Sequence, residues 1–277
     1  MINGNTELIA HIGYPTHTFK SPMIYNPYFE EAGINAVVVP MGCQSENYPA
    51  FLKAVFTLEN VRGALITMPH KVTTVGLLDD VTATVRVAGA CNAVKRLPDG
   101  RLVGDMFDGA GFVRGVQRKG FDPTGKRVLV VGTGGVGCAI AASLAGAGIA
   151  AISLFDMNNA SCNALAKRLK DNHPQIEVRT GSSDPTDHDL VVNATPMGMN
   201  ESDPLPLDVS RLSPDTFVGE VVMRTEMTAF LTAAQARGCR TQLGTDMLFE
   251  QIPAYLEFFG LPTTTADVLR RVAKLSY

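Results

Sequence analysis

The sequence has no apolar run close to the ~20 residues that a helix needs to cross a bilayer. It also has no basic excess, because 24 lysines and arginines stand against 27 aspartates and glutamates, for a formal charge of −3. A nucleic-acid backbone is therefore a poor candidate partner, and we expect a small-molecule ligand. The N-terminus has no basic segment followed by a continuous apolar stretch, so we expect no secretory signal and a cytoplasmic protein.

Paired cysteines and metal-ligand spacings are missing as well. The five cysteines are odd in number, scattered, and form no CxxC pair, which argues against a disulfide framework and a structural zinc site. His11, His17 and His70 occur early in the chain, but their spacing is not that of metal ligands and no carboxylate cluster joins them. We read them as a core histidine, a loop residue and a strand-end residue, and we expect no metal.

The length and hydrophobic content predict a globular α/β protein, with two domains as the expected organisation. The chain has 277 residues, of which 45% are hydrophobic and 18% charged. Between residues 7 and 105, short β-like runs alternate with segments of helical spacing, which predicts βαβ units and a largely parallel sheet. LPDG, residues 97–100, indicates a hairpin turn and thus an antiparallel piece. Ser21 is the predicted N-cap of a helix that begins at Pro22.

The most distinctive segment is RVLVVGTGGVGCAIAASLAGAG, residues 127–148, in which an apolar strand, a glycine-rich turn and an alanine-rich helix follow one another. Gly132 permits the tight turn, Gly134 lets the backbone approach a pyrophosphate, and Gly137 lets the helix and strand pack closely. The N-terminus of the helix offers oriented N–H groups to phosphate charge. The segment therefore predicts a dinucleotide-binding Rossmann unit. A glycine-rich turn without a ligand is the alternative.

The next strand ends at Asp156, about 20 residues after the glycine turn, where dinucleotide-binding folds place an acidic residue. A carboxylate at this position accepts hydrogen bonds from the ribose hydroxyls and repels a 2′-phosphate. Asp156 therefore favours NAD over NADP. The alternative is that Asp156 merely caps the helix that follows.

LVVNATPMGM, residues 190–199, is a further apolar strand with a loop that contains Thr195 and Pro196. In a doubly wound sheet, such a loop lies at the carboxyl ends of the strands, where the nicotinamide half of the cofactor is held. An ordinary strand-ending turn is the alternative.

With these segments placed, the chain resembles the shikimate dehydrogenase family, including its quinate/shikimate and dehydrogenase-like branches, nearly from end to end. The motifs that carry the resemblance are KSP at 20–22, TMPHK at 67–71, GACNAV at 89–94, GDMFDGAG at 104–111, the glycine turn at 132–137, NATPMG at 193–198 and LGTDMLFEQ at 243–251. The resemblance implies an N-terminal α/β substrate-binding domain, residues 1–106, on which C-terminal helices from about 246–277 pack. A Rossmann domain with a doubly wound parallel sheet would span residues 107–245.

The family also implies reversible hydride transfer between a nicotinamide, NAD or NADP, and a hydroxyl or ketone of an alicyclic hydroxy acid such as shikimate or quinate. By motif position, Lys71 and Asp108 would be the catalytic pair. The implied substrate-binding residues are Ser21, Thr67, Asn92 and Gln251. The implied cofactor-binding residues are Gly132, Gly134, Gly135, Val136, Gly137, Asp156, Thr195, Pro196, Val221, Gly244 and Met247. Judged without the resemblance, Lys71 and Asp108 would be solvated surface charges, and Asn92 and Gln251 could be satisfied core amides.

Five positions depart from the family pattern toward apolar side chains. A serine, two asparagines, a threonine and a tyrosine of the family are replaced, in chain order, by Phe19, Leu65, Met106, Phe107 and Met223. Ring hydroxyls of shikimate would lose partners at these positions, and such mismatches can cost orders of magnitude in specificity.

The substrate is therefore left open among shikimate, quinate, and a hydroxy acid that has fewer hydroxyls or is bulkier. The altered positions also allow a non-catalytic ligand-sensing module on the same fold. A dehydrogenase for an amino acid or a folate-linked substrate is more remote, because KSP and TMPHK are retained. Either a monomer or a homodimer is compatible with the sequence.

Overall fold

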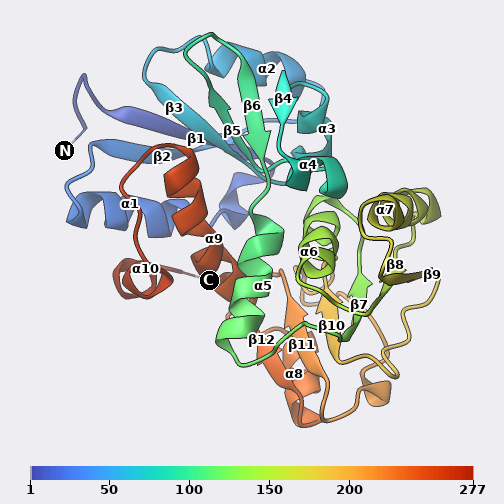
Figure 1. Cartoon of the computed structure of the whole chain (residues 1–277). Coiled ribbons are helices and arrows are strands. Elements are labelled where there is room, and N and C mark those ends of the chain that lie inside the picture. The colour runs from blue at the N-terminus through green and yellow to red at the C-terminus, as the bar shows by residue number, and fades with distance from the viewer. Residues whose placement is uncertain (1, 277) are drawn as a thin grey trace. The chain divides into compact units, whose positions relative to one another are not determined.

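The computed structural model describes residues 2–276, which form two compact units (Figure 1). Unit 1 consists of the chain up to Arg86, Ala90–Phe107 and Gln251–Ser276, and unit 2 consists of Val87–Gly89 and Asp108–Glu250. Each unit contains one six-stranded sheet with helices packed around it. The predicted α/β class with a Rossmann domain is confirmed.

The sheet of unit 1 has the strand order β2-β1-β3-β5-β6-β4. Its strands are β1 (Glu7–Gly13), β2 (Ala36–Gly42), β3 (Val61–Ile66), β4 (Asp80–Val81), β5 (Ala93–Arg96) and β6 (Leu102–Asp105). Only β5 runs against its neighbours, β3 and β6. The LPDG turn joins β5 to β6, and Gly100 adopts the positive φ of +90° that such a turn requires. The predicted hairpin is thus confirmed.

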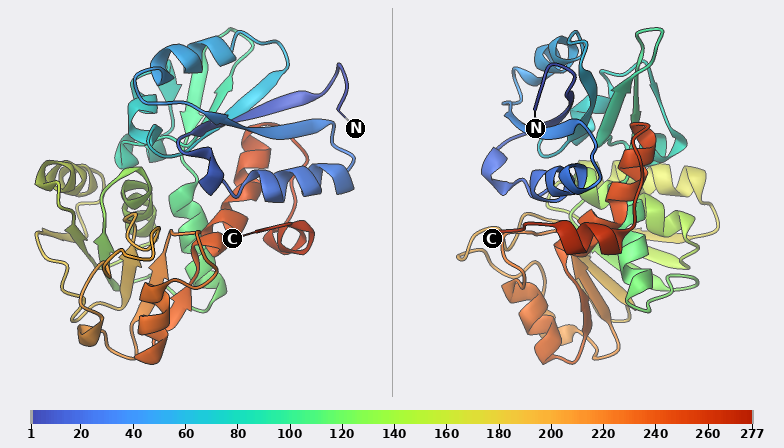
Figure 2. Two further views of the ribbon diagram at one scale, coloured as in Figure 1. Left: turned by 180° about the vertical axis from the view of Figure 1, so that it is seen from behind. Right: turned by 90° about the vertical axis from the view of Figure 1, so that its left-hand side faces the viewer.

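Helices of unit 1 come from both ends of the chain. They are α1 (Pro22–Glu31), α2 (Tyr48–Val55), α3 (Lys71–Val75), α4 (Ala83–Ala88), which reaches into the unit 2 segment, and α10 (Ala266–Val272), with a short 3-10 helix η1 (Thr16–Thr18). Figure 2 shows α10, in red, beside α1, in blue, in both views. The Arg271 guanidinium pairs with the Glu31 carboxylate at 2.5 Å, and the Lys274 N–H donates to the Met23 carbonyl at 2.9 Å. Contacts between residues more than 200 positions apart therefore hold the two ends of the chain together in this unit.

Unit 2 has an all-parallel sheet in the order β12-β11-β10-β7-β8-β9. Its strands are β7 (Arg127–Val131), β8 (Ala151–Phe155), β9 (Glu177–Thr180), β10 (Leu190–Asn193), β11 (Phe217–Glu220) and β12 (Arg240–Gln242). Its helices are α5 (Asp108–Arg118), α6 (Gly135–Gly146), α7 (Asn159–Asn172), α8 (Ala229–Ala236) and the first turns of α9 (Gly244–Phe258), with a 3-10 helix η2 (Val209–Arg211). Read from β9, this is the doubly wound order 3-2-1-4-5-6.

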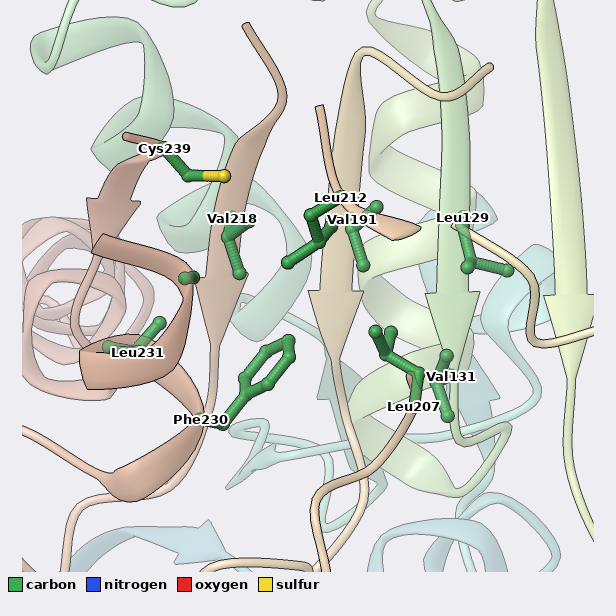
Figure 3. Packing of buried hydrophobic residues seen from close by; sticks show 10 residues of the cluster. Leu129, Val131, Val191, Leu207, Leu212, Val218, Phe230, Leu231 and Cys239 are labelled. Atoms are coloured by element: carbon green, nitrogen blue, oxygen red, sulfur yellow. The ribbon is translucent and has the colours of Figure 1, made fainter. Parts of the chain in front are cut away.

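The chain reverses its winding direction between β7 and β10, which is where open parallel sheets bind their ligands. All of β10, and all of β7 after Arg127, is buried, because helices cover the two faces of the sheet. Figure 3 shows side chains of β7, β10 and β11 meeting Phe230 and Leu231 of α8 in the core of unit 2. Within residues 2–276, no helix combines the length and the apolar character needed to cross a membrane.

Candidate functional site

Lys71 is a buried lysine at the start of α3, with 9% of its surface exposed, so it is not a solvated surface charge. The residue before it, His70, is fixed on two sides. Its Nε2 donates to the Cys43 carbonyl at 2.8 Å, and its ring stacks on Tyr48 with centroids 3.9 Å apart. Burial lowers the pKa of His70, so the imidazole is neutral and acts as a support. These contacts anchor the backbone from which the Lys71 side chain extends.

One backbone hydrogen bond and one side-chain hydrogen bond tie Lys71 and the residue before Asp108 to two consecutive residues of unit 1. The N–H of Cys91 donates to the Lys71 carbonyl at 2.8 Å. Next in the chain, the Oδ1 of Asn92 accepts from the N–H of Phe107 at 3.0 Å. Asp108 follows Phe107 directly, is 2% exposed and begins α5 of unit 2. The motifs TMPHK, GACNAV and GDMFDGAG, which are separate in the sequence, therefore meet along one hydrogen-bonded path.

Asn92 and Gln251 each keep a buried polar atom without a hydrogen-bond partner among the described residues. These atoms are the Nδ2 of Asn92, a donor, and the Oε1 of Gln251, an acceptor. The two residues are 0% and 5% exposed. On α9, Tyr255 lies one turn after Gln251 and its hydroxyl donates to the Asn92 carbonyl at 3.3 Å, so this face of the helix is turned toward Asn92. Neither amide is a fully satisfied core amide, and buried unsatisfied groups call for an explanation.

Phe19 and Leu65 form an apolar wall beside His11, near the carboxyl end of β1. Phe19 stacks on His11 with ring centroids 4.1 Å apart, and His11 is registered against Leu65 of β3. Burial, reinforced by the charge of Lys71, lowers the pKa of His11 to about 3, so this ring is neutral. Its Nδ1 has no hydrogen-bond partner among the described residues. A Cβ built on Gly13 would lie 2.4 Å from Cγ2 of Thr67 and 3.1 Å from the Phe19 ring. The absence of a side chain at Gly13 therefore allows Thr67 and Phe19 to pack against the backbone of β1.

Ser21 is at the predicted N-terminus of α1, but the expectation that its side chain caps the helix is wrong. Its backbone is helical and its hydroxyl makes no capping hydrogen bond, whereas Pro22 does occupy the first turn. Ser21 is 8% exposed and takes part in the first turn through its carbonyl, which accepts from Ile24 and Tyr25. The hydroxyl is therefore not committed to the helix, which suits a ligand-binding role better than a capping role.

The other departures from the family pattern differ in their surroundings. Met106 is fully buried. Phe107 packs edge-on against Tyr255 and Phe258 of α9, with centroids 4.8 and 5.7 Å away. Phe107 thus belongs to an aromatic cluster of unit 1, and its replacement of a threonine is a packing change. Met223 lies in unit 2, half-buried, in the segment after β11.

The glycine turn of unit 2 has close contacts that only glycine permits. A Cβ on Gly137 would lie 1.9 Å from the carbonyl oxygen of Gly132, and a Cβ on Gly132 would lie 2.7 Å from the backbone of Ala194. Gly132 also has a φ of +100°. Gly134, by contrast, faces open space with nothing within 4 Å of its Cβ position, at the N-cap of α6. This open approach to a helix N-terminus fits a dinucleotide pyrophosphate.

The turn is also joined to the first turn of α5. A Cβ on Gly109 would lie 2.1 Å from the Ala139 carbonyl oxygen, so α5 and α6 touch backbone to backbone there. Asp108 is the residue before this contact. The remaining predicted residues of the turn, Gly135 and Val136, form the half-buried first turn of α6.

Asp156 at the end of β8 does not cap the following helix, because Asn158 does so by accepting from the N–H groups of Ala160 and Ser161. Instead, the Oδ2 of Asp156 accepts from the N–H of Thr133 at 2.6 Å and from its hydroxyl at 3.0 Å. The capping alternative is therefore wrong. The carboxylate is anchored on the glycine turn and remains half-exposed beside it.

The loop after β10 packs directly on the glycine turn through Ala194. Asn193 holds the loop, since its Oδ1 accepts from the N–H and the hydroxyl of Thr195 at 3.1 and 2.6 Å and its Nδ2 donates to the Met197 carbonyl at 3.1 Å. Pro196 is exposed at the tip of this loop. Thr195 and Pro196 therefore lie next to the surface on which the predicted dinucleotide would rest.

Val221, Gly244 and Met247 form a second cluster at the same edge of the unit 2 sheet. The N–H of Val221 donates to the Asn193 carbonyl at 3.2 Å. A Cβ on Gly244 would lie 2.3 Å from the Val222 carbonyl oxygen, and Met247 on the same helix is buried at 3% exposure. The structure thus brings all the predicted cofactor residues to the carboxyl ends of β7, β8, β10 and β11, together with the start of α9.

Glu220, the last residue of β11, is a polar residue of this region that the sequence reasoning missed. It is 1% exposed, its Oε1 accepts from the Thr228 hydroxyl at 2.7 Å, and its Oε2 has no partner among the described residues. The available signal was a glutamate that ends the apolar run FVGE. Residues 2–276 contain no cluster of three or more His, Cys, Asp or Glu that could hold a metal ion.

Two protein-family models match the chain. The model described as the shikimate dehydrogenase substrate binding domain matches residues 11–94, and the model described as the ThiF family matches residues 124–170. A shikimate dehydrogenase (NADP(+)) from Acidiphilium cryptum is 33% identical over 272 residues, which cover 98% of this chain and 97% of the relative. A quinate/shikimate dehydrogenase from Escherichia coli is 30% identical over 262 residues, which cover 90% of each chain.

Solved structures of the same kind superpose over nearly the whole chain. Shikimate 5-dehydrogenase from Listeria monocytogenes, in complex with shikimate and NAD, has a TM-score of 0.87 at 26% identity and covers 98% of this chain and 97% of its own. Quinate dehydrogenase from Corynebacterium glutamicum, in complex with NAD, has a TM-score of 0.85 at 29% identity, with 96% and 98% covered. A 5-ketofructose reductase of Gluconobacter sp. has a TM-score of 0.84 at 28% identity, with 98% covered on both sides. By these full-length matches, the chain belongs to the shikimate dehydrogenase family of oxidoreductases.

Proposed function

We propose that this enzyme oxidises, reversibly and with NAD, a ring hydroxyl of an alicyclic hydroxy acid that carries fewer hydroxyl groups than shikimate. Lys71 and Asp108 are the proposed proton-transfer pair. The observation that carries the proposal is a buried shell in which a few polar atoms, on Asn92, Gln251 and His11, have no partner among the described residues, while Phe19 and Leu65 beside His11 are apolar.

The proton step belongs to Lys71. A bound nicotinamide supplies the hydride acceptor, and the hydroxyl proton must leave as the carbon becomes a ketone carbon. Lys71, anchored through His70 and Cys91, would take that proton on Nζ and return it in the reverse direction. Asp108 would hold the ammonium in place by charge, because a carboxylate beside a buried lysine offsets part of its desolvation.

The unpartnered atoms of Asn92 and Gln251 are one donor and one acceptor, which is a combination that one hydroxyl group can satisfy. A hydroxyl can accept a hydrogen bond from Asn92 Nδ2 and donate one to Gln251 Oε1, which would satisfy both orphan atoms at once. Ser21 and the N-terminus of α1 suit the substrate carboxylate. Shikimate carries further hydroxyls, and against the Phe19 and Leu65 side chains these would be buried without partners. A ring that lacks these further hydroxyls would bury no unpaired hydroxyl group against Phe19 and Leu65.

The proposed preference for NAD rests on Asp156. Its carboxylate is held on the glycine turn by Thr133, and a 2′-phosphate there would meet its negative charge. The segment DMNNA that follows β8 contains no arginine or lysine to receive such a phosphate. The relatives named NADP(+) therefore do not determine the cofactor of this chain.

The first experiment measures reduced nicotinamide at 340 nm with the purified chain, NAD or NADP, and a series of ring acids. The series contains shikimate, quinate and 3-hydroxycyclohexane-1-carboxylate, which has a single ring hydroxyl. We expect the highest kcat/KM with NAD and the least hydroxylated acid. Equal or better turnover of shikimate would overturn the substrate proposal, and faster turnover with NADP would overturn the cofactor proposal.

A double variant tests the apolar wall directly. Phe19→Ser with Leu65→Asn restores the polar types of the family pattern, and we expect kcat/KM for shikimate to rise at least about 10-fold relative to the single-hydroxyl acid. Leu58→Asn, an exposed change in the same unit, is the matched control and should leave the ratio unchanged. An unchanged ratio in the double variant would show that the wall does not select the substrate.

A ketose is the second candidate substrate, favoured by the similarity to a 5-ketofructose reductase. Reduction of 5-ketofructose with NADH is therefore assayed beside the ring acids. A kcat/KM above that of every acid would replace the acid with a ketose while leaving the dehydrogenase chemistry in place.

A further inference from the structure

Glu220 lies where two elements of unit 2 meet, and it contacts both. It ends β11, next to Asn193 of β10 in the parallel register, and its Oε1 accepts from the Thr228 hydroxyl at 2.7 Å. Thr228 in turn is the N-cap of α8 and accepts from the N–H of Leu231 at 3.2 Å. The carboxyl group thus joins the end of β10 to the start of α8.

The same two residues shape the loop 194–199. Asn193 holds Thr195 and Met197 by three side-chain hydrogen bonds, and Gly198 passes over Thr228, with 4.0 Å between its Cβ position and that side chain. The loop packs against the glycine turn, because the Ala194 backbone occupies the space that a Cβ on Gly132 would need. A displacement of Asn193 or Thr228 would therefore move the surface beside the turn.

A carboxylic acid is a costly way to contact two uncharged side chains, Thr228 and Asn193, in this place. Oε2 is buried with no partner among the described residues, and an apolar side chain of the same length would fill the same space. The groups that act on the carboxyl, Thr228 from α8 and Asn193 from β10, are uncharged. Burial is the largest influence and raises the pKa of Glu220 to about 7, so both protonation states are populated near neutrality.

We propose that Glu220 is a positioning residue for dinucleotide binding, which sets the loop 194–199 against the glycine turn through Asn193 and Thr228. The inference rests on the proposed function, because it requires a dinucleotide at the glycine turn. The neutral carboxyl group is the supporting form. The ionised form places an unpaired negative charge beneath a surface that must receive the negatively charged pyrophosphate.

The test titrates the full chain with NADH, followed by nicotinamide fluorescence, at pH 6, 7 and 8, with a thermal melt of every variant. Glu220→Met keeps the volume and removes the hydrogen bond to Thr228, and it should weaken NADH binding about 10-fold at pH 6. Glu220→Gln keeps an acceptor for Thr228 and should bind NADH as wild type does at pH 6. Wild-type affinity should fall from pH 6 to pH 8, whereas the affinity of Glu220→Gln should not.

Glu226→Gln is the matched control, since it changes an exposed glutamate of the same β11–α8 connection and should reproduce the wild-type profile. Thr228→Val is a second loss variant should Glu220→Met fail to fold, with the same expected loss of affinity. NADH binding by a folded loss variant that equals wild type at every pH would overturn the proposal, as would a Glu220→Gln profile that still falls with pH. A wild-type chain that binds neither NADH nor NADPH would instead overturn the proposed function itself.

Discussion

The two candidate sites are built from different material. In unit 2, the cofactor surface consists mainly of backbone: three glycines, a helix N-terminus and a loop held by one asparagine. In unit 1, the substrate shell consists of side chains, of which Phe19 and Leu65 depart from the family pattern while Lys71 and Asn92 are kept. A backbone surface can change only if the fold changes, whereas a side-chain surface can change one residue at a time. We therefore expect the fold to constrain the candidate cofactor site more firmly than the candidate substrate site.

The largest effect is expected at Lys71, the proposed proton-transfer residue, because a change there separates chemistry from cofactor binding. Lys71→Ala should lower kcat by about 10²–10⁴-fold, because the hydroxyl proton loses its acceptor. The dissociation constant for NADH should stay unchanged, since unit 2 is untouched. Steady-state kinetics and fluorescence titration measure the two quantities. Lys53→Ala, an exposed lysine in the same unit, is the control, and retention of more than a tenth of kcat in Lys71→Ala would rule out the role.

Next in size is the effect of closing the open approach in unit 2. Gly134→Ala adds a methyl group that meets no protein atom within 4 Å, so the fold should persist while NADH binding weakens by about 10-fold or more. Gly137→Ala differs, because its methyl group would collide with the Gly132 carbonyl and should lower the melting temperature. Gly146→Ala in the same helix meets nothing and is the control. A Gly134→Ala variant that binds NADH as wild type does would show that the dinucleotide does not rest on the backbone at Gly134. The contrast between a cofactor site made of backbone and a substrate site made of side chains would then fail.

A smaller effect is expected at Asp156, the side chain on which the proposed choice of cofactor rests. Asp156→Ser should shift the ratio of kcat/KM for NAD over NADP toward NADP by about 10-fold, because it removes the charge that repels a 2′-phosphate. The ratio is the useful readout, since the loss of the hydrogen bonds to Thr133 affects both cofactors alike. Asp171→Ser, exposed near the end of α7, should leave the ratio as it is. A ratio unaffected by Asp156→Ser would refute the NAD assignment.

The last expected effect concerns the stability of the fold and its dependence on pH, and leaves both candidate sites in place. Glu220 binds its proton more tightly in the folded state, where its pKa is about 7, than at its ordinary value of 4.5. Glu220 therefore makes its full contribution to the free energy of unfolding below pH 4.5, where the carboxyl group is protonated in both states. This contribution is lost as the pH rises from 4.5 to 7, because the unfolded chain releases the proton in this range and the folded chain keeps it. Glu220→Gln should therefore gain stability over wild type by about 2–3 kcal/mol between pH 4.5 and 8. Urea unfolding at pH 5 and pH 8 measures the difference in the free energy of unfolding between Glu220→Gln and wild type. A difference that is the same at both pH values would contradict the prediction.

Elements with a strong local pattern could be predicted from the sequence. The glycine turn, the parallel sheet of unit 2, the LPDG hairpin and the start of α1 at Pro22 all follow from short segments whose residues have few other conformations. Family motifs then supplied residues such as Asn92 and Gln251, whose importance no local pattern could reveal. What the structure adds is that each keeps an unpartnered atom.

Relations that depend on tertiary packing could not be predicted. The stacking of Phe19 on His11 requires the path of the loop after β1, and the binding of Asp156 to Thr133 requires the approach of β8 to the glycine turn. Glu220 carried no motif, since a glutamate at the end of a strand is usually solvated. Its burial follows only from α8, which covers the end of β11 and brings Thr228 onto it.

The guanidinium of Arg168 on α7 determines where unit 2 can be cut out of the chain, for example to exchange it with that of a relative. It donates from Nε to the Val87 carbonyl at 2.8 Å and from Nη2 to the Ala88 carbonyl at 3.0 Å, and these carbonyls belong to a three-residue piece of unit 2 that interrupts unit 1. A fragment cut at residues 108 and 250 would lack both acceptors. Chimeras or separately expressed Rossmann fragments of this enzyme should therefore carry residues 87–89 with them, because unit 2 is assembled from two stretches of chain.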